Sequence, residues 1–244
     1  MSSSLYKIIN RDVGKAIHAY DMIDDGDRIM VGLSGGKDSL TLLWILRERL
    51  SRVPIHYDII PVYIDPGFEG GYHRELIEYV KKMDFHLRVE MTDYGIISHS
   101  DVNRENPCFL CSRLRRKRLF ELMDELNCNK LALGHHKDDI IETFFLNVCY
   151  SAEISTLLPS QTFFGGAFKM IRPLAYLDED VIKRFSKQMY FPVFENPCPS
   201  SKRSKRKEIK DILNDFYRGN RKVKGNIFRA LHNVKPEYLL KKKS

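Results

Sequence analysis

The chain has 244 residues, which is enough for one α/β domain with a well-filled core but too few for two domains of ordinary size. Its 40 basic and 32 acidic side chains give a net charge of +8, a balance that suits a polyanionic partner. No stretch reaches the about 20 apolar residues of a membrane span, and residues 1–5 lack a basic region followed by an apolar run. We therefore expect a cytoplasmic protein with no membrane partner and no secretory signal.

Strands and helices are predicted to alternate along the chain. The apolar run at residues 29–33 is followed by a Gly-rich loop and by apolar residues at helical spacing, which predicts a strand, a loop and a helix. Four further strands are predicted at residues 57–64, 87–91, 130–134 and 168–171, and amphipathic helices at residues 72–83, 112–126, 138–150 and 178–189. This alternation predicts a five-stranded parallel sheet with helices on both faces, whose ligands bind at the carboxyl ends of the strands.

The composition shifts near Cys198, after which the chain is basic and reads as helical to about His232. We divide the chain into a catalytic domain with an N-terminal helix, residues 1–199, and a basic helical segment, residues 200–244. That segment either packs on the domain or faces RNA. Basic side chains concentrate at residues 113–118, 202–207 and 241–243, although a solvated helix face or a tail would have the same composition.

The loop after the first predicted strand is suited to phosphate. It opens a helix, so free backbone N–H groups and the positive end of the helix dipole face an incoming anion. A Walker A loop would need four residues between its glycines and Ser or Thr after its Lys; here Gly32 and Gly36 have three residues between them, and Asp38 follows Lys37. A plain turn is the alternative. The loop reads Ser34, Gly35, Gly36, Lys37, Asp38 and Ser39.

This hexapeptide resembles the PP-loop of the ATP pyrophosphatases, which release pyrophosphate while adenylating a carbonyl oxygen. The resemblance implies an adenine nucleotide alpha-hydrolase-like, Rossmann-type fold that binds ATP and Mg²⁺. It also implies that backbone amides and the hydroxyls of Ser34 and Ser39 hold pyrophosphate. Lys37 would neutralise charge, and Asp38 would lie on the magnesium side.

A second motif lies where the fourth predicted strand ends. Its residues are Gly134, His135, His136, Lys137, Asp138 and Asp139, followed by Glu142 and Thr143. Adjacent carboxylates are costly unless they are solvated or coordinate a cation, and a helix N-cap would account for only one Asp. The motif resembles that of PP-loop enzymes that modify tRNA, in which the first Asp helps hold metal and nucleotide. The resemblance places Gly134, His135, Asp138 and Asp139 at the nucleotide, and Val62 and Ile64 at the adenosine.

Three cysteines lie in loop contexts. Cys108 and Cys111 have the spacing of metal ligands just before a predicted helix, and zinc, redox and iron–sulfur sites all use this spacing. Cys198 offers a third thiolate between prolines. Cys128 and Cys149 are expected in the core. Three thiolates leave a zinc site incomplete unless a histidine closes it, whereas a cubane cluster with one open iron fits.

Several strings resemble the TtcA family, the tRNA 2-thiocytidine synthetases, nearly end to end. They lie at residues 14–17, 22–28, 34–39, 111–116, 134–143, 171–174, 209–213 and 226–234. The resemblance implies a [4Fe–4S] cluster on Cys108, Cys111 and Cys198, with sulfide delivered through the open iron. The implied target is an anticodon-loop cytidine, position 32, which becomes 2-thiocytidine with release of AMP and pyrophosphate.

The hypothetical reaction begins when Mg–ATP adenylates the C2 oxygen of the cytosine. Asp38 and Asp138 would position magnesium, and Lys37 and Arg115 would balance charge. Arg115 lies one helical turn after Cys111; an ordinary contact to the RNA backbone is the alternative for it. The expected partners are tRNA and a sulfur donor, either sulfide or the product of a cysteine desulfurase, and a homodimer is left open.

Two rival functions remain. One is another PP-loop enzyme, a lysidine-type tRNA ligase or a small-molecule amidating enzyme, with structural zinc on the three cysteines. The other is a non-catalytic module that binds RNA or a nucleotide. The intact Asp38, Asp138 and Asp139 speak against the second.

Overall fold

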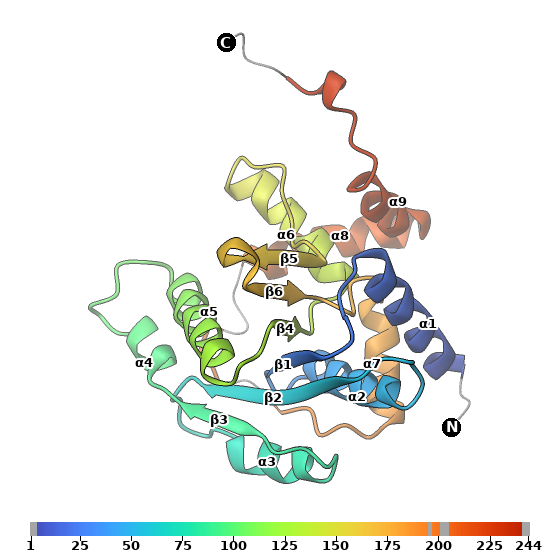
Figure 1. Cartoon of the computed structure of the whole chain (residues 1–244). Helices are drawn as coiled ribbons and strands as arrows, with labels where there is room; N and C mark the ends of the chain where they lie inside the picture. The colour runs from blue at the N-terminus through green and yellow to red at the C-terminus, as the bar shows by residue number, and fades with distance from the viewer. Residues whose placement is uncertain (1–3, 195–196, 201–204, 241–244) are drawn as a thin grey trace. The chain divides into compact units, whose positions relative to one another are not determined.

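A six-stranded sheet organises the larger part of the chain (Figure 1). The computed structural model describes residues 4–194, 197–200 and 205–240. The strand order is β3-β2-β1-β4-β6-β5. The strands are β1 (Asp27–Leu33), β2 (Tyr57–Asp65), β3 (Arg88–Met91), β4 (Lys130–Leu133), β5 (Ser160–Phe163) and β6 (Phe168–Ile171).

The predicted α/β class and parallel pairing are confirmed, but the predicted strand count of five is wrong. The additional strand is β5, which pairs antiparallel with β6 at the edge of the sheet. Its sequence, Ser-Gln-Thr-Phe, has only one apolar residue and therefore gives no hydrophobic run. Backbone pairing with the following strand, β6, rather than a side-chain pattern, creates this strand.

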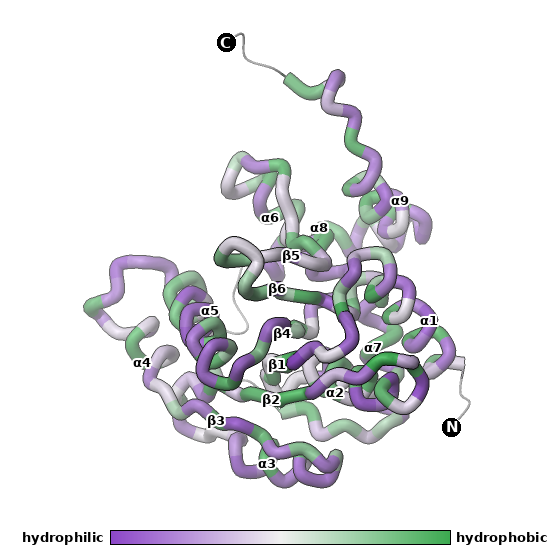
Figure 2. Tube along the Cα trace, in the orientation of Figure 1, coloured by the Kyte–Doolittle hydropathy of each residue, from purple (hydrophilic) through white to green (hydrophobic). Residues whose placement is uncertain are grey.

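The sheet is buried on both faces because successive residues of its strands enter different cores. Ile29 and Val31 of β1 belong to a core that includes α1, α2, α3 and α7, whereas Met30 belongs to a second core that includes α5. Figure 2 shows the middle of β2 in hydrophobic colours and α5 with both kinds of residue. Helices therefore cover both faces of the sheet, as predicted.

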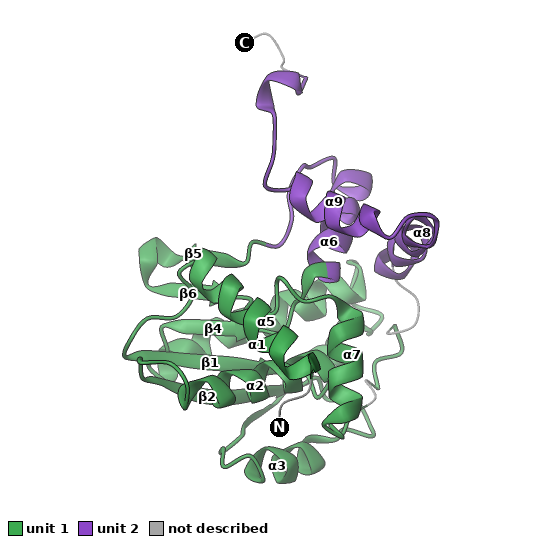
Figure 3. Cartoon of the chain, turned by 90° about the vertical axis from the view of Figure 1, so that its right-hand side faces the viewer, with its two compact units in different colours: residues 1–137, 158–203 green, residues 138–157, 204–244 purple. Residues whose placement is uncertain are grey.

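By its contacts the chain divides into two compact units (Figure 3). Unit 1 comprises residues 1–137 and 158–203, and unit 2 comprises residues 138–157 and 204–244. This grouping differs from the predicted division at residue 199, since it joins residues 138–157 to the C-terminal segment. Unit 1 has the helices α1 (Ser4–Ala19), α2 (Lys37–Leu50), α3 (His73–Lys81), α4 (Tyr94–Ser98), α5 (Pro107–Glu125) and α7 (Glu179–Gln188), and the 3-10 turn η1 (Phe164–Gly166).

Helix α5 begins five residues before its predicted start at residue 112. The side chain of Asn106 caps it by accepting hydrogen bonds from the backbone N–H groups of Cys108 and Phe109, at 3.0 and 3.3 Å. Pro107 occupies the first turn, where no N–H is needed. Cys108 and Cys111 therefore lie on the first turns of a helix and not in a loop before it.

Unit 2 consists of helices around a small apolar centre. Its elements are α6 (Lys137–Tyr150), α8 (Lys205–Gly219), α9 (Lys222–Ala230) and the 3-10 turn η2 (Pro236–Tyr238), with Lys137 itself counted in unit 1. Its buried apolar residues include Ile140, Ile141, Ile209, Leu213 and Phe228.

The two cysteines expected in the core have different environments. Cys128 is buried as expected, but Cys149 is exposed and its prediction is wrong. Cys149 lies in the last turn of α6, where Val148 and Tyr150 are exposed as well.

Parts of two predicted basic runs, Lys202, Arg203 and residues 241–243, lie outside the described residues. None of the helices in the described part of the chain has the length and apolar character needed to cross a bilayer.

The Phe185→Ala variant should lose about 3–5 kcal/mol of unfolding free energy, because it opens a cavity in the larger core. Phe185 is 1% exposed, and its ring centroid lies 5.0 Å from that of Trp44 and 5.9 Å from that of Phe191. Urea unfolding followed by circular dichroism measures the loss. Val102→Ala, at an 82% exposed position, should change the free energy by no more than about 0.5 kcal/mol. Equal losses in both variants would contradict the assignment of this core.

Candidate active site

The loop at residues 34–39 connects β1 to α2 at the carboxyl edge of the sheet. Gly35 has φ +70°, and a Cβ added there would lie 2.5 Å from the Tyr72 ring, so only glycine fits. Ser39 ties the loop together: its hydroxyl accepts from the Ser34 N–H at 3.1 Å and donates to the Gly36 carbonyl at 3.0 Å. The two serine hydroxyls lie 3.2 Å apart. The loop is thus folded around the hydroxyls that the sequence motif supplies.

A lysine at the start of α2 forms ion pairs with two carboxylates. The Nζ of Lys37 lies 3.0 Å from Asp38 Oδ2 and 3.2 Å from Glu179 Oε1. Burial lowers the pKa of Lys37, but the two carboxylates outweigh burial and the pKa is raised, so the ammonium stays charged. Asp38 Oδ1 is buried and has no hydrogen-bond partner among the described residues, and His136 Nε2 is 3.7 Å away. An acceptor of this kind suits a cation.

The loop after β4 lies directly against the start of α2. A Cβ added to Gly134 would lie 3.0 Å from both Asp38 C and Ser39 N, so glycine is needed for this close approach. The neighbouring His135 accepts a hydrogen bond at Nδ1 from the Nε of Arg172, which is buried, at 3.3 Å. Because β1 pairs with β2 on one side and β4 on the other, the chain order reverses here, and ligands of such sheets bind at this point.

The end of β2 presents little side-chain surface. Val62 and Ile64 are 1% and 2% exposed, so their predicted contact with adenosine would have to come from backbone groups. The next residue, Asp65, is also buried, accepts from the Gly67 N–H at 2.9 Å and lies 3.0 Å from His73 Nδ1. Asp65 therefore fixes the turn that follows β2.

Within unit 2, the acidic residues of the second motif face cations of the C-terminal helices. Asp138 forms an ion pair with Lys224. Arg206 lies 3.2 Å from Asp139 and 3.3 Å from Glu142. Burial raises the pKa of Glu142, and the neighbouring cations oppose that rise. The carboxylates of this motif belong to unit 2, whereas Asp38 of the phosphate loop belongs to unit 1.

The three predicted metal ligands belong to unit 1 and interact with one another. Burial raises the pKa of the Cys108 and Cys111 thiols, and the charge of Cys198 raises both further. Hydroxyl groups oppose this, since Ser200 hydrogen-bonds Cys108 and Ser98 hydrogen-bonds Cys111. Across the described residues, no three His, Cys, Asp or Glu side chains are arranged as a ready metal site.

A histidine that the sequence motifs did not single out lies beside Cys198. The Nε2 of His99 is 3.9 Å from Cys198 Sγ and 2.8 Å from Ser200 Oγ. Its Nδ1 is 2.8 Å from the Gly95 carbonyl, which can only accept, so Nδ1 donates. The ring is therefore held with Nε2 toward the cysteines.

Arg115 acts electrostatically on one cysteine and on two tyrosines near the loop. Its charge lowers the pKa of Cys111 and of the Tyr63 and Tyr72 phenols, each against a larger effect of burial. Its Nε is buried and has no hydrogen-bond partner in the described parts of the chain. The Tyr72 hydroxyl in turn donates to the Ser34 carbonyl at 2.6 Å. Arg115 is thus a cation with an unused buried donor whose charge acts both on a thiol and on the tyrosine that binds the phosphate loop.

Sequence reasoning missed several residues around these sites. Three residues contact the loop from distant segments: Tyr72, which directly precedes α3, Glu179 of α7, and Phe194 in the segment after α7. Of these residues, only Glu179 had a local sequence signal, because it lies in the first turn of a predicted helix. An acidic residue there is ordinarily explained by its interaction with the helix dipole.

Known proteins resemble this chain along most of its length. The chain matches the PP-loop domain family over residues 5–215. It is 40% identical over 247 residues to the tRNA-cytidine(32) 2-sulfurtransferase of Geotalea daltonii, covering 100% of this chain and 98% of that one. It is 41% identical over 239 residues to the protein of the same name from Geotalea uraniireducens, covering 97% and 95%.

Solved structures with low sequence identity share the fold. The U34-tRNA thiolase NcsA from Methanococcus maripaludis, with its [4Fe-4S] cluster, has a TM-score of 0.79 at 24% identity and covers 97% of this chain and 80% of that one. The NH3-dependent NAD synthetase from Campylobacter jejuni has a TM-score of 0.53 at 14% identity, with 97% and 95% covered. By its sequence over its whole length, the chain belongs to the tRNA-cytidine(32) 2-sulfurtransferase family of PP-loop proteins.

Proposed function

We propose that the chain is an ATP-dependent tRNA sulfurtransferase that converts an anticodon-loop cytidine, position 32, to 2-thiocytidine. The observation that carries the proposal is that, within unit 1, the charge of Arg115 acts on both Cys111 and Tyr72, and the Tyr72 hydroxyl binds the phosphate loop. A nucleotide site and a thiol site thus share one cation. The cytoplasm, where tRNA is found, is the proposed location.

The first step is adenylation of the base. The C2 oxygen of cytidine attacks the α-phosphorus of ATP, the bond to the β-phosphate breaks, and pyrophosphate leaves. Backbone N–H groups of the 34–39 loop would hold that pyrophosphate, and Lys37, kept charged by its carboxylates, would offset its charge. Asp38, whose Oδ1 is buried without a hydrogen bond among the described residues, is the proposed carboxylate of unit 1 for magnesium. The role of Asp138 at magnesium stays a prediction from the sequence motif.

The second step replaces the activated oxygen by sulfur, and AMP leaves with that oxygen. Cys108, Cys111 and Cys198 fit a [4Fe–4S] cluster in donor chemistry, because their thiols interact with one another. Three thiolate ligands would bind three of the four irons and leave one iron for another ligand. When bound, the cluster would supply the sulfur as sulfide. His99, Ser98 and Ser200 would hold the thiol environment through the hydrogen bonds described above.

The surface of α5 beside the cysteines suits RNA. Phe109, between the two cysteines, is 60% exposed, and the guanidinium of Arg113 lies 5.6 Å from its ring centroid. Arg116 and Lys117 are exposed on the next turn. Cationic groups suit the phosphate backbone, and an exposed aromatic ring suits stacking by an unpaired base.

The rival functions are less well supported. The relatives that match along their whole length carry the sulfurtransferase name and not that of a lysidine-type or amidating ligase. A non-catalytic module would have no need for an ammonium held charged beside a buried carboxylate oxygen at the phosphate loop.

The function is tested by incubating purified chain anaerobically with unmodified tRNA, Mg–ATP and sulfide, then digesting the tRNA for mass spectrometry of its nucleosides. The expected product is 2-thiocytidine, formed with one pyrophosphate per base. Cys198→Ala should form none while still binding ATP, and Cys149→Ala, at an exposed thiol of unit 2, should match the unaltered chain. Full 2-thiocytidine formation by Cys198→Ala would contradict the three-ligand model.

Metal content separates the proposal from its zinc rival. Anaerobically purified chain should contain about four iron and four sulfide ions and absorb in the visible range through iron–sulfur charge transfer. Cys108→Ala should lose most of this iron, whereas Cys149→Ala should keep it. A colourless chain with one zinc would favour the ligase reading.

Reversing charge on α5 should weaken tRNA binding. The double variant Arg116→Glu, Lys117→Glu removes two cations, so the slope of log K against log salt should fall in magnitude by about 2. Filter binding over a range of salt concentrations measures the slope. Lys81→Glu, Lys82→Glu makes the same charge change at exposed positions of α3 and its C-cap. The same loss in this control would show that only net charge matters.

A further inference from the structure

Two stacked aromatic rings pack on the phosphate loop. Tyr72 directly precedes α3, and Phe194 lies in the segment after α7. Their ring centroids are 4.9 Å apart with 7° between the planes. A Cβ added at Gly35 would lie 2.5 Å from the Tyr72 ring and 3.2 Å from the Phe194 ring. The pair therefore touches the loop backbone at its one left-handed residue.

The same two residues bind consecutive carbonyl groups of the loop. The Tyr72 hydroxyl donates to the Ser34 carbonyl at 2.6 Å, and the Phe194 backbone N–H donates to the Gly35 carbonyl at 3.2 Å. Burial raises the pKa of the Tyr72 phenol, so its hydroxyl keeps the proton that it donates. Two neighbouring peptide groups are thus held from the same side.

Holding a carbonyl also sets the direction of the next N–H. In a trans peptide the N–H points opposite to the C=O, and the described residues contain no cis peptide bond. The Ser34 carbonyl therefore fixes the N–H of Gly35, and the Gly35 carbonyl fixes the N–H of Gly36. In agreement, the Gly36 N–H points into the loop, 3.4 Å from the Ser34 hydroxyl.

We propose that Tyr72 and Phe194 are positioning residues of the phosphate site, which hold the N–H groups of Gly35 and Gly36 toward the pyrophosphate of ATP before it binds. The proposal rests on the proposed function, since it requires a nucleotide at this loop. Donors oriented in advance lose less entropy on binding and need no rearrangement when pyrophosphate forms. Consecutive N–H groups around a left-handed residue form an anion-binding concavity.

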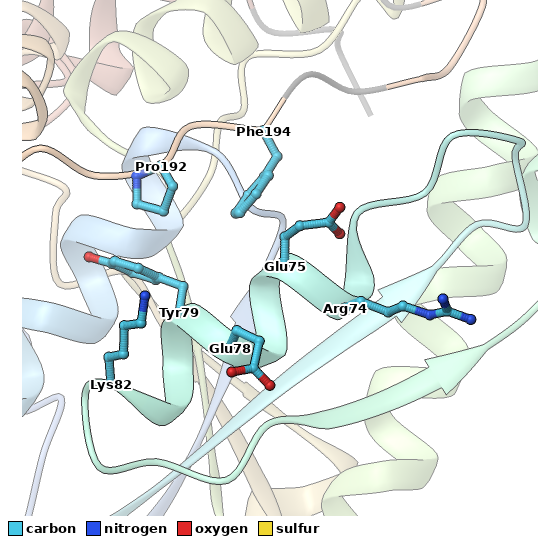
Figure 4. A pocket seen from close by; sticks show the side chains of 7 residues that line it. All are labelled: Arg74, Glu75, Glu78, Tyr79, Lys82, Pro192 and Phe194. Carbon is cyan, nitrogen blue, oxygen red and sulfur yellow. The ribbon is translucent and has the colours of Figure 1, made fainter.

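The Phe194 ring is partly buried and also packs against the larger core. It lines an open groove of about 470 Å³ together with Tyr79 and Pro192, and charged side chains of α3 complete the lining (Figure 4). The stack with Tyr72, the hydrogen bond to Gly35 and the contact with the larger core together hold Phe194 at the loop.

The test is calorimetric titration of the full chain with inorganic pyrophosphate in magnesium buffer. Tyr72→Phe keeps the ring and removes the hydroxyl, which donates to the Ser34 carbonyl and also hydrogen-bonds with Tyr63. Pyrophosphate should therefore bind about tenfold more weakly. Tyr79→Phe, a half-buried tyrosine on the same helix, should bind as the unaltered chain does. Unchanged affinity in Tyr72→Phe, or the same loss in Tyr79→Phe, would overturn the inference.

Two variants at Phe194 test the stack separately, because both keep the backbone N–H. Phe194→Ala should weaken pyrophosphate binding, and Phe194→Tyr, which keeps a ring, should restore it. A general folding defect would instead lower the melting temperature in step with affinity, and that result would overturn the positioning role. If the unaltered chain bound neither pyrophosphate nor ATP, the proposed function itself would fail. If it bound both and the variants bound equally well, only the positioning role would fail.

Discussion

The close approach of two backbones at the carboxyl edge of the sheet is the constraint on which the site depends. Parallel pairing of β1 with β4 brings Gly134 against the first residues of α2, with no room for a side chain between them. That contact fixes where α2 begins, and so where Lys37 and Asp38 stand. His136 near Asp38 and Arg172 near His135 lie at the same edge of the sheet. A bulkier residue at position 134 would displace the phosphate loop itself.

Much of the fold was predictable because its signals are local. Apolar runs and helical spacing predicted the parallel sheet and its covering helices, and a helix-opening Gly-rich turn predicted the phosphate loop. The failures have physical reasons. β5 forms by pairing with an edge and has no apolar pattern, and α5 begins early because Asn106 caps it. Cys149 lies at a helix end where its apolar neighbours are also exposed.

The only residues of the candidate site that could be predicted are those that lie together in a short sequence motif. The loop residues and the cysteines come in short strings, whereas their partners come from far along the chain. Glu179, which helps keep Lys37 charged, and Phe194, which holds Gly35, have no local signature. Such contacts exist only after the sheet has assembled. The roles of Arg115 and Asp138 stay predictions, although Arg115 carries a buried donor with no hydrogen-bond partner among the described residues.

The ion pairs of unit 2 have a consequence for the order of synthesis. Asp138 and Asp139 take their counter-charges from Lys224 and Arg206, and residues 158–203 separate the two sets along the chain. While the ribosome is still adding residues 158–203, unit 1 can complete its sheet, but Arg206 of α8 and Lys224 of α9 have not yet been added. These two ion pairs of unit 2 therefore form only after α8 and α9 have been synthesised.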